Sequence, residues 1–161
     1  MDSSFREELL EQELENFARD VIEQLRGLGA KVEITRGKIS LPLNDKEIKV
    51  REDIETSNGR YYFRKDQIWK SCYIPHADNP GVYFFFDKHA VALYVGKSET
   101  TIGERVASHV GKYENGKFPK LAFPEAEYVI VIPFETGPFL APAFESYLLS
   151  KYTFKYNTVG Q

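Results

Sequence analysis

The stretch that decides the fold of this chain is GVYFFFDKHAVALYVGKSETTIGERVASHVGKY, residues 81–113. It opens with two runs rich in apolar and aromatic residues, at 81–86 and 91–95, on either side of a short polar turn. Runs of this length predict two buried strands, and the short connection predicts that they pair antiparallel. Gly96 is expected to end the second strand, where a small residue allows the close approach of backbone or ligand.

A helix is predicted directly after these strands, over about 101–113. Thr101 and Glu104 are spaced as a capping box at its start. Its apolar stripe recurs every four positions, at Ile102, Val106 and Val110. An adjacent polar stripe comprises Arg105, His109 and Lys112. If the apolar stripe packs on the two strands, the polar stripe lies at the rim and faces the strand ends.

The motif residues of this stretch resemble those of the GIY-YIG nuclease family. Gly81-Val82-Tyr83 stands for the first name-giving triplet and Tyr94-Val95-Gly96 for the second, with valine in place of isoleucine in both. The resemblance continues with Lys97 after the second triplet, Arg105 on the helix, and His109 one turn later, where many members carry tyrosine. Either triplet alone is a weak signal. Both together, followed by an Arg-x-x-x-His helix, form a fairly specific one.

The C-terminal third predicts a strand over 128–132 and a helix that begins at Pro142, with Glu145 in its first turn. An acidic residue there most often serves the helix dipole. The resemblance implies another role, because the family places its metal-binding glutamate on this helix and an asparagine shortly after it, which Asn157 matches. The family order of strand, strand, helix, strand, helix and asparagine covers about residues 80–158.

The fold expected for the whole chain is α+β. It has a small central antiparallel or mixed sheet flanked by helices, in a β-β-α-β-α core, with an N-terminal helix and β-hairpin as an extension. The N-terminal helix is predicted from a capping box at Ser4 and Glu7 to stops at Gly27 and Gly29. Its apolar positions are Phe5, Leu9, Leu14, Phe17, Val21, Leu25 and Leu28. Alternating apolar residues over 32–43 predict the hairpin.

Two domains follow from this division. Residues 1–79 form a region of unassigned function, with substrate recognition or dimerisation as candidate roles, and residues 80–161 form the nuclease-like core. The first helix has an acidic outer face, which is repulsive to nucleic acid and most simply interpreted as a solvated surface. It could also contact a second copy of the chain or a partner protein. The acidic positions are Glu7, Glu8, Glu11 and Glu15.

Charge and composition limit the function classes. The net charge of -3 over 161 residues argues weakly against a general polyanion binder. Residues 1–58 hold 9 Lys/Arg against 14 Asp/Glu, whereas residues 59–161 hold 12 against 10, a charge balance that leaves room for a basic face on the C-terminal part. The candidate nucleic-acid contacts are Lys112, Lys117, Lys120, Arg64 and Lys65.

The single cysteine, Cys72, excludes an internal disulfide and a cysteine-based zinc site, and it suits a reducing compartment. No apolar run approaches the roughly 20 residues that a membrane-spanning helix needs. The N-terminus is acidic and does not have the pattern of a signal peptide. A cytoplasmic protein without membrane contact is therefore expected.

The resemblance implies a metal-dependent endonuclease acting on DNA, with RNA left open as a substrate. Glu145 would hold one divalent cation, Mg²⁺ or Mn²⁺, through its carboxylate oxygens. Arg105 would clamp the phosphate, because its planar guanidinium fits two oxygens. Asn157 would fix the geometry by hydrogen bonds.

The same resemblance makes Tyr83 the candidate general base for the attacking water. A tyrosine titrates near 10, so it needs a nearby cation to act at neutral pH, and Lys97 is the expected cause of a lowered pKa. Tyr94 and His109 would position the water or relay its proton.

A rival hypothesis belongs to another class: a non-catalytic nucleic-acid-binding or accessory subunit that uses the same fold. The presence of the polar residues in family order favours the enzyme, whereas the acidic net charge favours the rival. A plasmid nicking assay with variants at Glu145 and Tyr83 discriminates between them.

Overall fold

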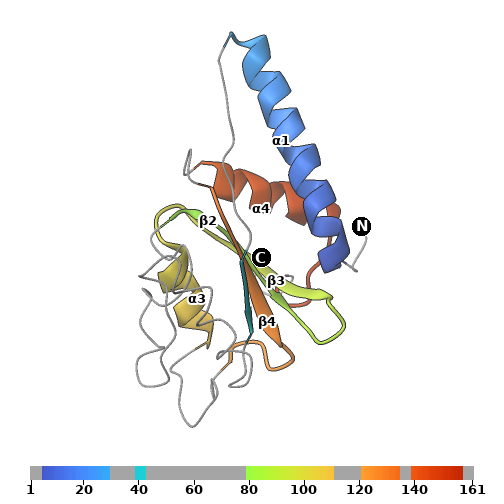
Figure 1. Ribbon diagram of the computed structural model, residues 1–161, viewed down its shortest axis with the longest axis vertical. Coiled ribbons are helices and arrows are strands. Elements are labelled where there is room, and N and C mark those ends of the chain that lie inside the picture. The colour runs from blue at the N-terminus through green and yellow to red at the C-terminus, as the bar shows by residue number, and fades with distance from the viewer. Residues whose placement is uncertain (1–4, 30–38, 43–78, 111–120, 135–138, 158–161) are drawn as a thin grey trace.

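The computed structural model describes residues 5–29, 39–42, 79–110, 121–134 and 139–157. These residues form a four-stranded antiparallel sheet with helices on both of its faces (Figure 1). The α+β architecture predicted from the sequence is confirmed, and among the described strands every pairing is antiparallel.

The sheet has the strand order β1-β4-β2-β3. Its strands are β1 (Ile39–Pro42), β2 (Gly81–Phe86), β3 (Ala92–Ser98) and β4 (Tyr128–Pro133). The predicted hairpin of β2 and β3 is present, with Tyr83 opposite Gly96. One detail was wrong: Gly96 does not end β3, because the strand continues through it to Ser98.

Strand β2 is the centre of the core, since all six of its residues are buried. Successive side chains of a strand point to opposite faces of the sheet, so β2 contributes to two separate apolar clusters. Tyr83 and Phe85 belong to the cluster beneath helix α3 (Ile102–Val110). Val82, Phe84 and Phe86 belong to the cluster beneath the N-terminal and C-terminal helices.

Helix α3 follows β3 after a tight turn that is held by a buried serine. The Ser98 hydroxyl oxygen accepts hydrogen bonds from the backbone N–H groups of Thr100, at 3.2 Å, and Thr101, at 2.8 Å. The predicted apolar stripe of Ile102, Val106 and Val110 is buried, which confirms the direction in which the helix packs. The residues predicted to extend the helix past 110 lie outside the described part of the chain.

Helix α4 (Leu140–Lys151) begins two residues earlier than predicted. Pro142 is its third residue, where the missing N–H costs little because the first four N–H groups of a helix have no intrahelical partner. Glu145 therefore lies in the second turn, and the first turn contains no acidic residue. The prediction that Glu145 lies in the first turn was wrong, and Glu145 lies beyond the turn in which an acidic residue serves the helix dipole.

The N-terminal helix also starts differently from the prediction. A 3₁₀ turn, η1 (Glu7–Leu9), leads into α1 (Leu10–Gly27), and no side chain caps either start. Ser4, the other half of the predicted capping box, lies outside the described residues; the Glu7 carboxylate accepts a hydrogen bond from the Tyr128 hydroxyl at 2.6 Å. The predicted stop is confirmed, with Gly29 at φ 83°, but Leu28 is 82% exposed and not part of the apolar face.

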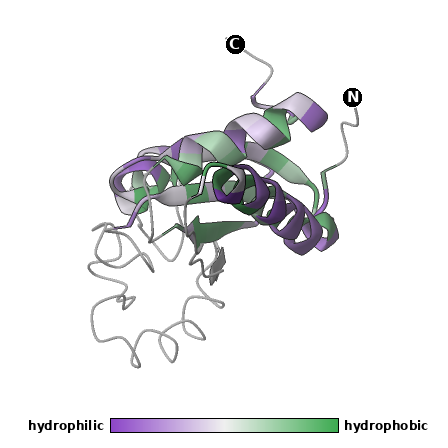
Figure 2. Cartoon of the chain, turned by 90° about the horizontal axis from the view of Figure 1, so that it is seen from above, coloured by the Kyte–Doolittle hydropathy of each residue, from purple (hydrophilic) through white to green (hydrophobic). Residues whose placement is uncertain are grey.

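Helix α1 crosses α4 with its N-terminal part and packs on the same face of the sheet (Figures 1 and 2). Phe5 stacks on Phe84 with ring centroids 5.7 Å apart, and Phe17 contacts Phe144 at 5.0 Å. Figure 2 shows α1 as a largely hydrophilic helix beside a hydrophobic sheet. Residues from the N-terminal region therefore complete the core beneath α4.

The division into a region 1–79 and a core 80–161 stays a prediction. Of the predicted hairpin, residues 39–42 form β1, which pairs with β4, and residues 32–34 lie outside the described part. Among the residues that the structure describes, no helix is long and apolar enough to cross a membrane.

Candidate active site

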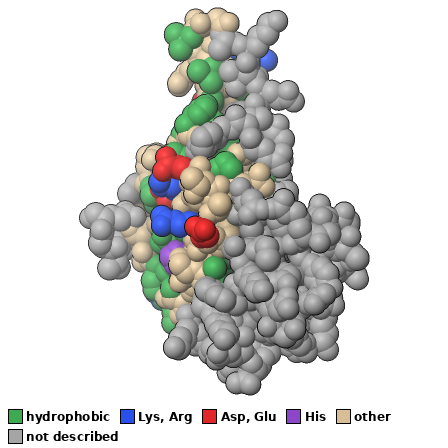
Figure 3. All heavy atoms as spheres, turned by 90° about the vertical axis from the view of Figure 1, so that its left-hand side faces the viewer, with side chains coloured by type: hydrophobic (Ala, Val, Ile, Leu, Met, Phe, Trp, Pro, Cys, Tyr) green, Lys and Arg blue, Asp and Glu red, His purple; other side chains and the backbone are tan. Residues whose placement is uncertain are grey.

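The predicted site residues gather around β3, which is the edge strand of the described sheet. Tyr94 and Lys97 lie on β3 itself, Arg105 lies on α3, and Glu145 lies on α4. Basic, acidic and histidine side chains appear together on the face that Figure 3 shows, the side of the molecule that carries α3. The sheet edge thus brings together residues that are up to 51 positions apart in the sequence.

The innermost pair of the site is Tyr83 and His109. Tyr83 is 1% exposed, and its hydroxyl lies 3.1 Å from the Nε2 atom of His109. The ring of Tyr83 lies directly against Gly96, where a Cβ atom would be 2.4 Å from the tyrosine hydroxyl. Gly96 is therefore required at this position, because any side chain would collide with the ring of Tyr83.

Burial raises the pKa of Tyr83 well above its ordinary value of 10.0. The neighbouring Tyr94 raises it further, and the positive charge of Arg105 lowers it only in part. The prediction that Lys97 lowers this pKa is wrong. The Lys97 ammonium pairs with Glu99 at 2.9 Å and does not contribute to the pKa of Tyr83. Tyr83 is thus a neutral phenol at neutral pH.

His109 lies in an aromatic enclosure. Its ring centroid is within 6 Å of those of four other rings, which belong to Tyr83, Phe85, Tyr94 and Phe123. Burial lowers the pKa of His109 below 6.5, and the charge of Arg105 lowers it further. The imidazole is therefore neutral at pH 7, and one of its nitrogens can accept a proton.

Arg105 and Lys97 supply the positive charge of the site. Arg105 is exposed on α3, and its Nε–H makes a long contact of 3.5 Å with the Lys97 carbonyl oxygen. This contact places the guanidinium beside the end of β3, on an exposed residue. Both cations lower the pKa of Glu145, which shows that they lie close to that carboxylate.

Glu145 is a half-buried carboxylate, and burial raises its pKa above the ordinary value of 4.5 even though Lys97 and Arg105 lower it. Within the part of the chain that the structure describes, it makes no hydrogen bond or ion pair. A partly desolvated carboxylate without such a partner fits a divalent cation, which prefers oxygen ligands. No group of three or more His, Cys, Asp and Glu side chains gathers around it among those residues, so a cation would rest on one carboxylate.

Asn157 supports the outer edge of β3. It is 7% exposed, its Oδ1 accepts from the Val95 N–H at 2.7 Å, and its Nδ2 donates to the Val95 carbonyl at 2.9 Å. The backbone N–H of Tyr156 also donates to the Leu93 carbonyl at 2.9 Å. The C-terminal segment thus bonds to the edge strand at Leu93 and Val95.

The structure also reveals residues that the sequence did not single out. Phe123 stacks on Tyr94 with centroids 4.7 Å apart and encloses His109, and Ser98 holds the turn into α3. Phe123 lies in an irregular segment, where no periodicity marks a buried ring. The predicted nucleic-acid contacts Lys112, Lys117, Lys120, Arg64 and Lys65 all lie outside the described residues.

Comparison with known protein families gives a match to this part of the chain. The model of the GIY-YIG catalytic domain matches residues 79–157, which begin two residues before β2 and end at Asn157. No curated protein matches the chain.

Proposed function

We propose that this chain hydrolyses phosphodiester bonds of DNA, because the model of the GIY-YIG catalytic domain matches residues 79–157 and that family consists of endonucleases. The observation that carries this proposal is the half-buried carboxylate of Glu145, which has no hydrogen-bond partner among the described residues and feels the charges of Lys97 and Arg105. Its own charge acts on Tyr83, which contacts His109. A phosphodiester needs a nucleophile, a proton acceptor and positive charge, and these residues supply the last two.

Proton transfer is assigned to the buried pair. We infer the tautomer of His109 that carries its proton on Nδ1, so that Nε2 accepts the hydrogen bond from Tyr83. As water attacks phosphorus, Tyr83 takes a proton from it and passes its own hydroxyl proton to His109. This route does not need an ionised tyrosine, which agrees with the raised pKa of Tyr83. Tyr94, the more exposed of the two tyrosines, holds the water beside Tyr83.

We assign to Arg105 the neutralisation of negative charge on the phosphate oxygens, because its N–H groups can form two parallel hydrogen bonds with them. When bound, a divalent cation would neutralise further negative charge and stabilise the leaving oxygen. Family members are generally dependent on a divalent metal, and Glu145 is the residue of this chain that would hold it, as Mg²⁺ or Mn²⁺. Lys97 partly neutralises the charge of Glu145. This role replaces the predicted one, in which Lys97 lowers the pKa of Tyr83.

The test is a plasmid nicking assay with Mg²⁺ that compares the wild type with Glu145→Gln, Tyr83→Phe and His109→Ala. Loss of proton transfer should slow nicking by about 10²–10⁴-fold. Glu145→Gln should abolish nicking, whereas Ser146→Ala, an exposed neighbour on the same helix, should leave it unchanged. Equal rates in all variants would overturn the assignment, and a parallel single-stranded RNA substrate tests the choice of DNA.

A further inference from the structure

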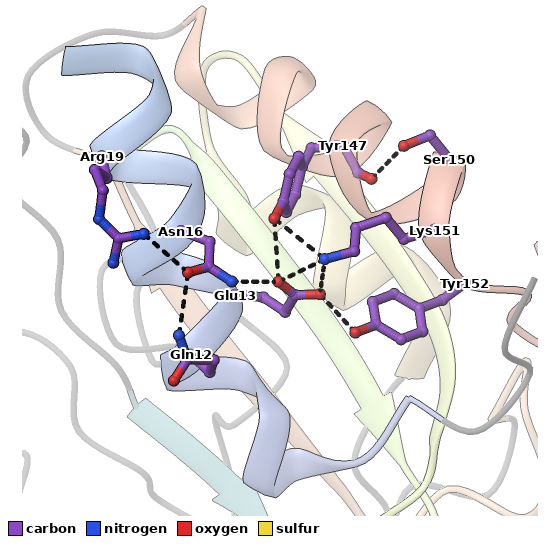
Figure 4. Close-up of polar contacts among 8 residues, drawn as sticks. All are labelled: Gln12, Glu13, Asn16, Arg19, Tyr147, Ser150, Lys151 and Tyr152. Atoms are coloured by element: carbon purple, nitrogen blue, oxygen red, sulfur yellow. Dashed lines mark hydrogen bonds and ion pairs between the residues drawn. The ribbon is translucent and has the colours of Figure 1, made fainter. Parts of the chain in front are cut away.

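A second cluster of polar residues lies between α1 and α4, away from the candidate active site. Its centre is the carboxylate of Glu13, which is 3% exposed (Figure 4). The Oε1 atom accepts hydrogen bonds from Asn16 at 3.1 Å and from the Tyr147 hydroxyl at 3.1 Å. The Lys151 ammonium lies 2.6 Å from Oε2, and the Tyr152 hydroxyl donates to Oε2 at 2.5 Å.

This cluster is fully satisfied, which distinguishes it from a ligand site. Burial by itself raises the pKa of Glu13, but the hydrogen bonds from Lys151, Tyr152, Asn16 and Tyr147 outweigh it, so that the pKa is lowered. A buried carboxylate is tolerated only with such partners, because an unpaired one would cost several kcal/mol. Glu13 is therefore ionised and immobilised by directional contacts.

Three of the four donors come from α4 and its exit. Tyr147 follows Glu145 by two positions, and residues two apart on a helix point in roughly opposite directions. Figure 4 shows Tyr147 and Lys151 reaching from α4 toward Glu13 on α1. Helix α4 is thus held on one side by Glu13, while its other side presents Glu145 to the candidate active site.

The remaining contacts between α1 and α4 are apolar. Phe17 packs on the rings of Phe144 and Tyr147, with centroids 5.0 and 5.7 Å apart. Apolar burial is non-directional, so it holds the two helices together without fixing how far one slides along the other. Hydrogen bonds depend steeply on distance and angle, and the bonds to Glu13 therefore set the position of α4 along α1.

We propose that Glu13 is a positioning residue for the metal site, which acts through α4 on the placement of Glu145. This inference rests on the proposed function, because it requires that Glu145 bind a cation. The proposal adds a residue of α1, which lies outside the matched residues 79–157, to those that support the candidate active site. Without the Glu13 bonds, α4 stays packed but Glu145 loses its fixed distance from Arg105 and Lys97.

The experiment measures the affinity of the full chain for Mn²⁺ alone by water-proton relaxation, without substrate. The variants are Glu13→Gln, whose amide cannot accept bonds at both of its ends, and the milder Tyr152→Phe, which removes one hydroxyl. Both should raise the Kd for Mn²⁺, Glu13→Gln by about threefold to tenfold, less than the 10–100-fold typical of a direct outer-shell partner of a metal ligand. Near-UV circular dichroism at the same temperature verifies that each variant is folded.

Two further variants separate the possible failures. Tyr128→Phe removes the hydroxyl that donates to Glu7, a bond that ties the same N-terminal region to β4 and not to α4, so its Kd should equal that of the wild type. Glu145→Gln should remove Mn²⁺ binding, and if it does not, the proposed function itself is overturned. If Glu145→Gln removes binding but Glu13→Gln and Tyr152→Phe leave the Kd unchanged, the role of Glu13 is structural only and this inference is wrong.

Discussion

At Gly96 the backbone of β3 lies against the ring of Tyr83. A Cβ atom there would be 2.4 Å from both Cζ and the hydroxyl oxygen of that ring. We expect Gly96→Ala to displace Tyr83 from His109, to lower the free energy of unfolding by about 1–3 kcal/mol, and to abolish nicking. Urea unfolding and the nicking assay measure the two effects.

The matched control is Gly27→Ala. A Cβ atom at Gly27 would meet nothing within 4 Å, and alanine has the higher helix propensity, so stability should stay the same or rise by up to about 1 kcal/mol. If Gly96→Ala were as stable as Gly27→Ala, the close packing of Tyr83 on β3 would be refuted.

His109 makes stability depend on pH, since its pKa is lowered in the folded protein by burial and by Arg105. Below its ordinary value of 6.5, the unfolded chain binds the proton more readily than the folded one. The contribution of His109 to the free energy of unfolding is therefore fully present above pH 6.5, and it is lost as pH falls through the pKa of His109 in the folded protein. Thermal unfolding between pH 5 and 7 should show a smaller loss of stability for His109→Phe than for the wild type, and parallel curves would contradict this.

The identities of the site residues could be predicted from the sequence because the motif is local. Tyr83, Tyr94 and Arg105 lie within 23 positions of one another, on two strands and a helix whose patterns are clear. The role of Lys97 could not be predicted, because it depends on which charges come close in space. Glu99 pairs with Lys97 in the folded chain, and the burial of Tyr83 determines its pKa.

At the scale of elements, the contact between α1 and α4 makes stability sensitive to acid. The pKa of Glu13 is lowered in the folded state from its ordinary value of 4.5. Its contribution to the free energy of unfolding is therefore present above pH 4.5 and is lost as pH falls through the folded pKa. At pH 7, Glu13→Gln should cost about 1–3 kcal/mol of unfolding free energy. That difference from the wild type should shrink below pH 4.5 in urea titrations, and a constant difference would contradict the ionised state of Glu13.

The pairing of the C-terminal segment with β3 gives another prediction. Asn157→Ala removes two hydrogen bonds and leaves the N–H and carbonyl of Val95 without these partners, so we expect a loss of about 2–4 kcal/mol. Asn157→Asp, which keeps the shape, should also destabilise the protein, because a carboxylate accepts hydrogen bonds but cannot donate to the Val95 carbonyl. Wild-type stability of Asn157→Asp in urea would show that the amide does not donate.

Helix and strand positions followed from periodicity, whereas their exact ends did not. Pro142 marked the first turn of α4, but the helix begins before it because the first turn tolerates proline at more than one position. Glu13 carried a readable signal: it stands three residues after Leu10 and four before Phe17, on the buried side of α1. An acidic residue on an apolar stripe indicates a buried partner, although the sequence does not identify it.

At the scale of the whole molecule, the core depends on residues far from the matched domain. Phe5, Leu14 and Phe17 are buried against β2 and α4. We expect a fragment of residues 79–161 to lose cooperative unfolding, because removing these side chains exposes the apolar face of α4 to water. Calorimetry and amide NMR dispersion compare the fragment with the full chain. A fragment that unfolds cooperatively near the wild-type temperature would establish 80–161 as an independent domain.

The fold of the whole molecule could be predicted only in part from the sequence. The α+β class followed from the order of strands and helices, but the sheet order β1-β4-β2-β3 depends on long-range pairing that no local pattern specifies. The same holds for the packing of α1 on α4, which joins Glu13 to residues more than 130 positions away.

Strand β2 has large apolar side chains on both of its faces, and this creates a problem of register during folding. A shift of β2 by two residues against β3 would keep every side chain on its original face and bury almost the same apolar area. What distinguishes the native alignment is steric: only Gly96 leaves room for the ring of Tyr83. The glycine of the second triplet therefore favours the native register over a hairpin that is shifted by two residues.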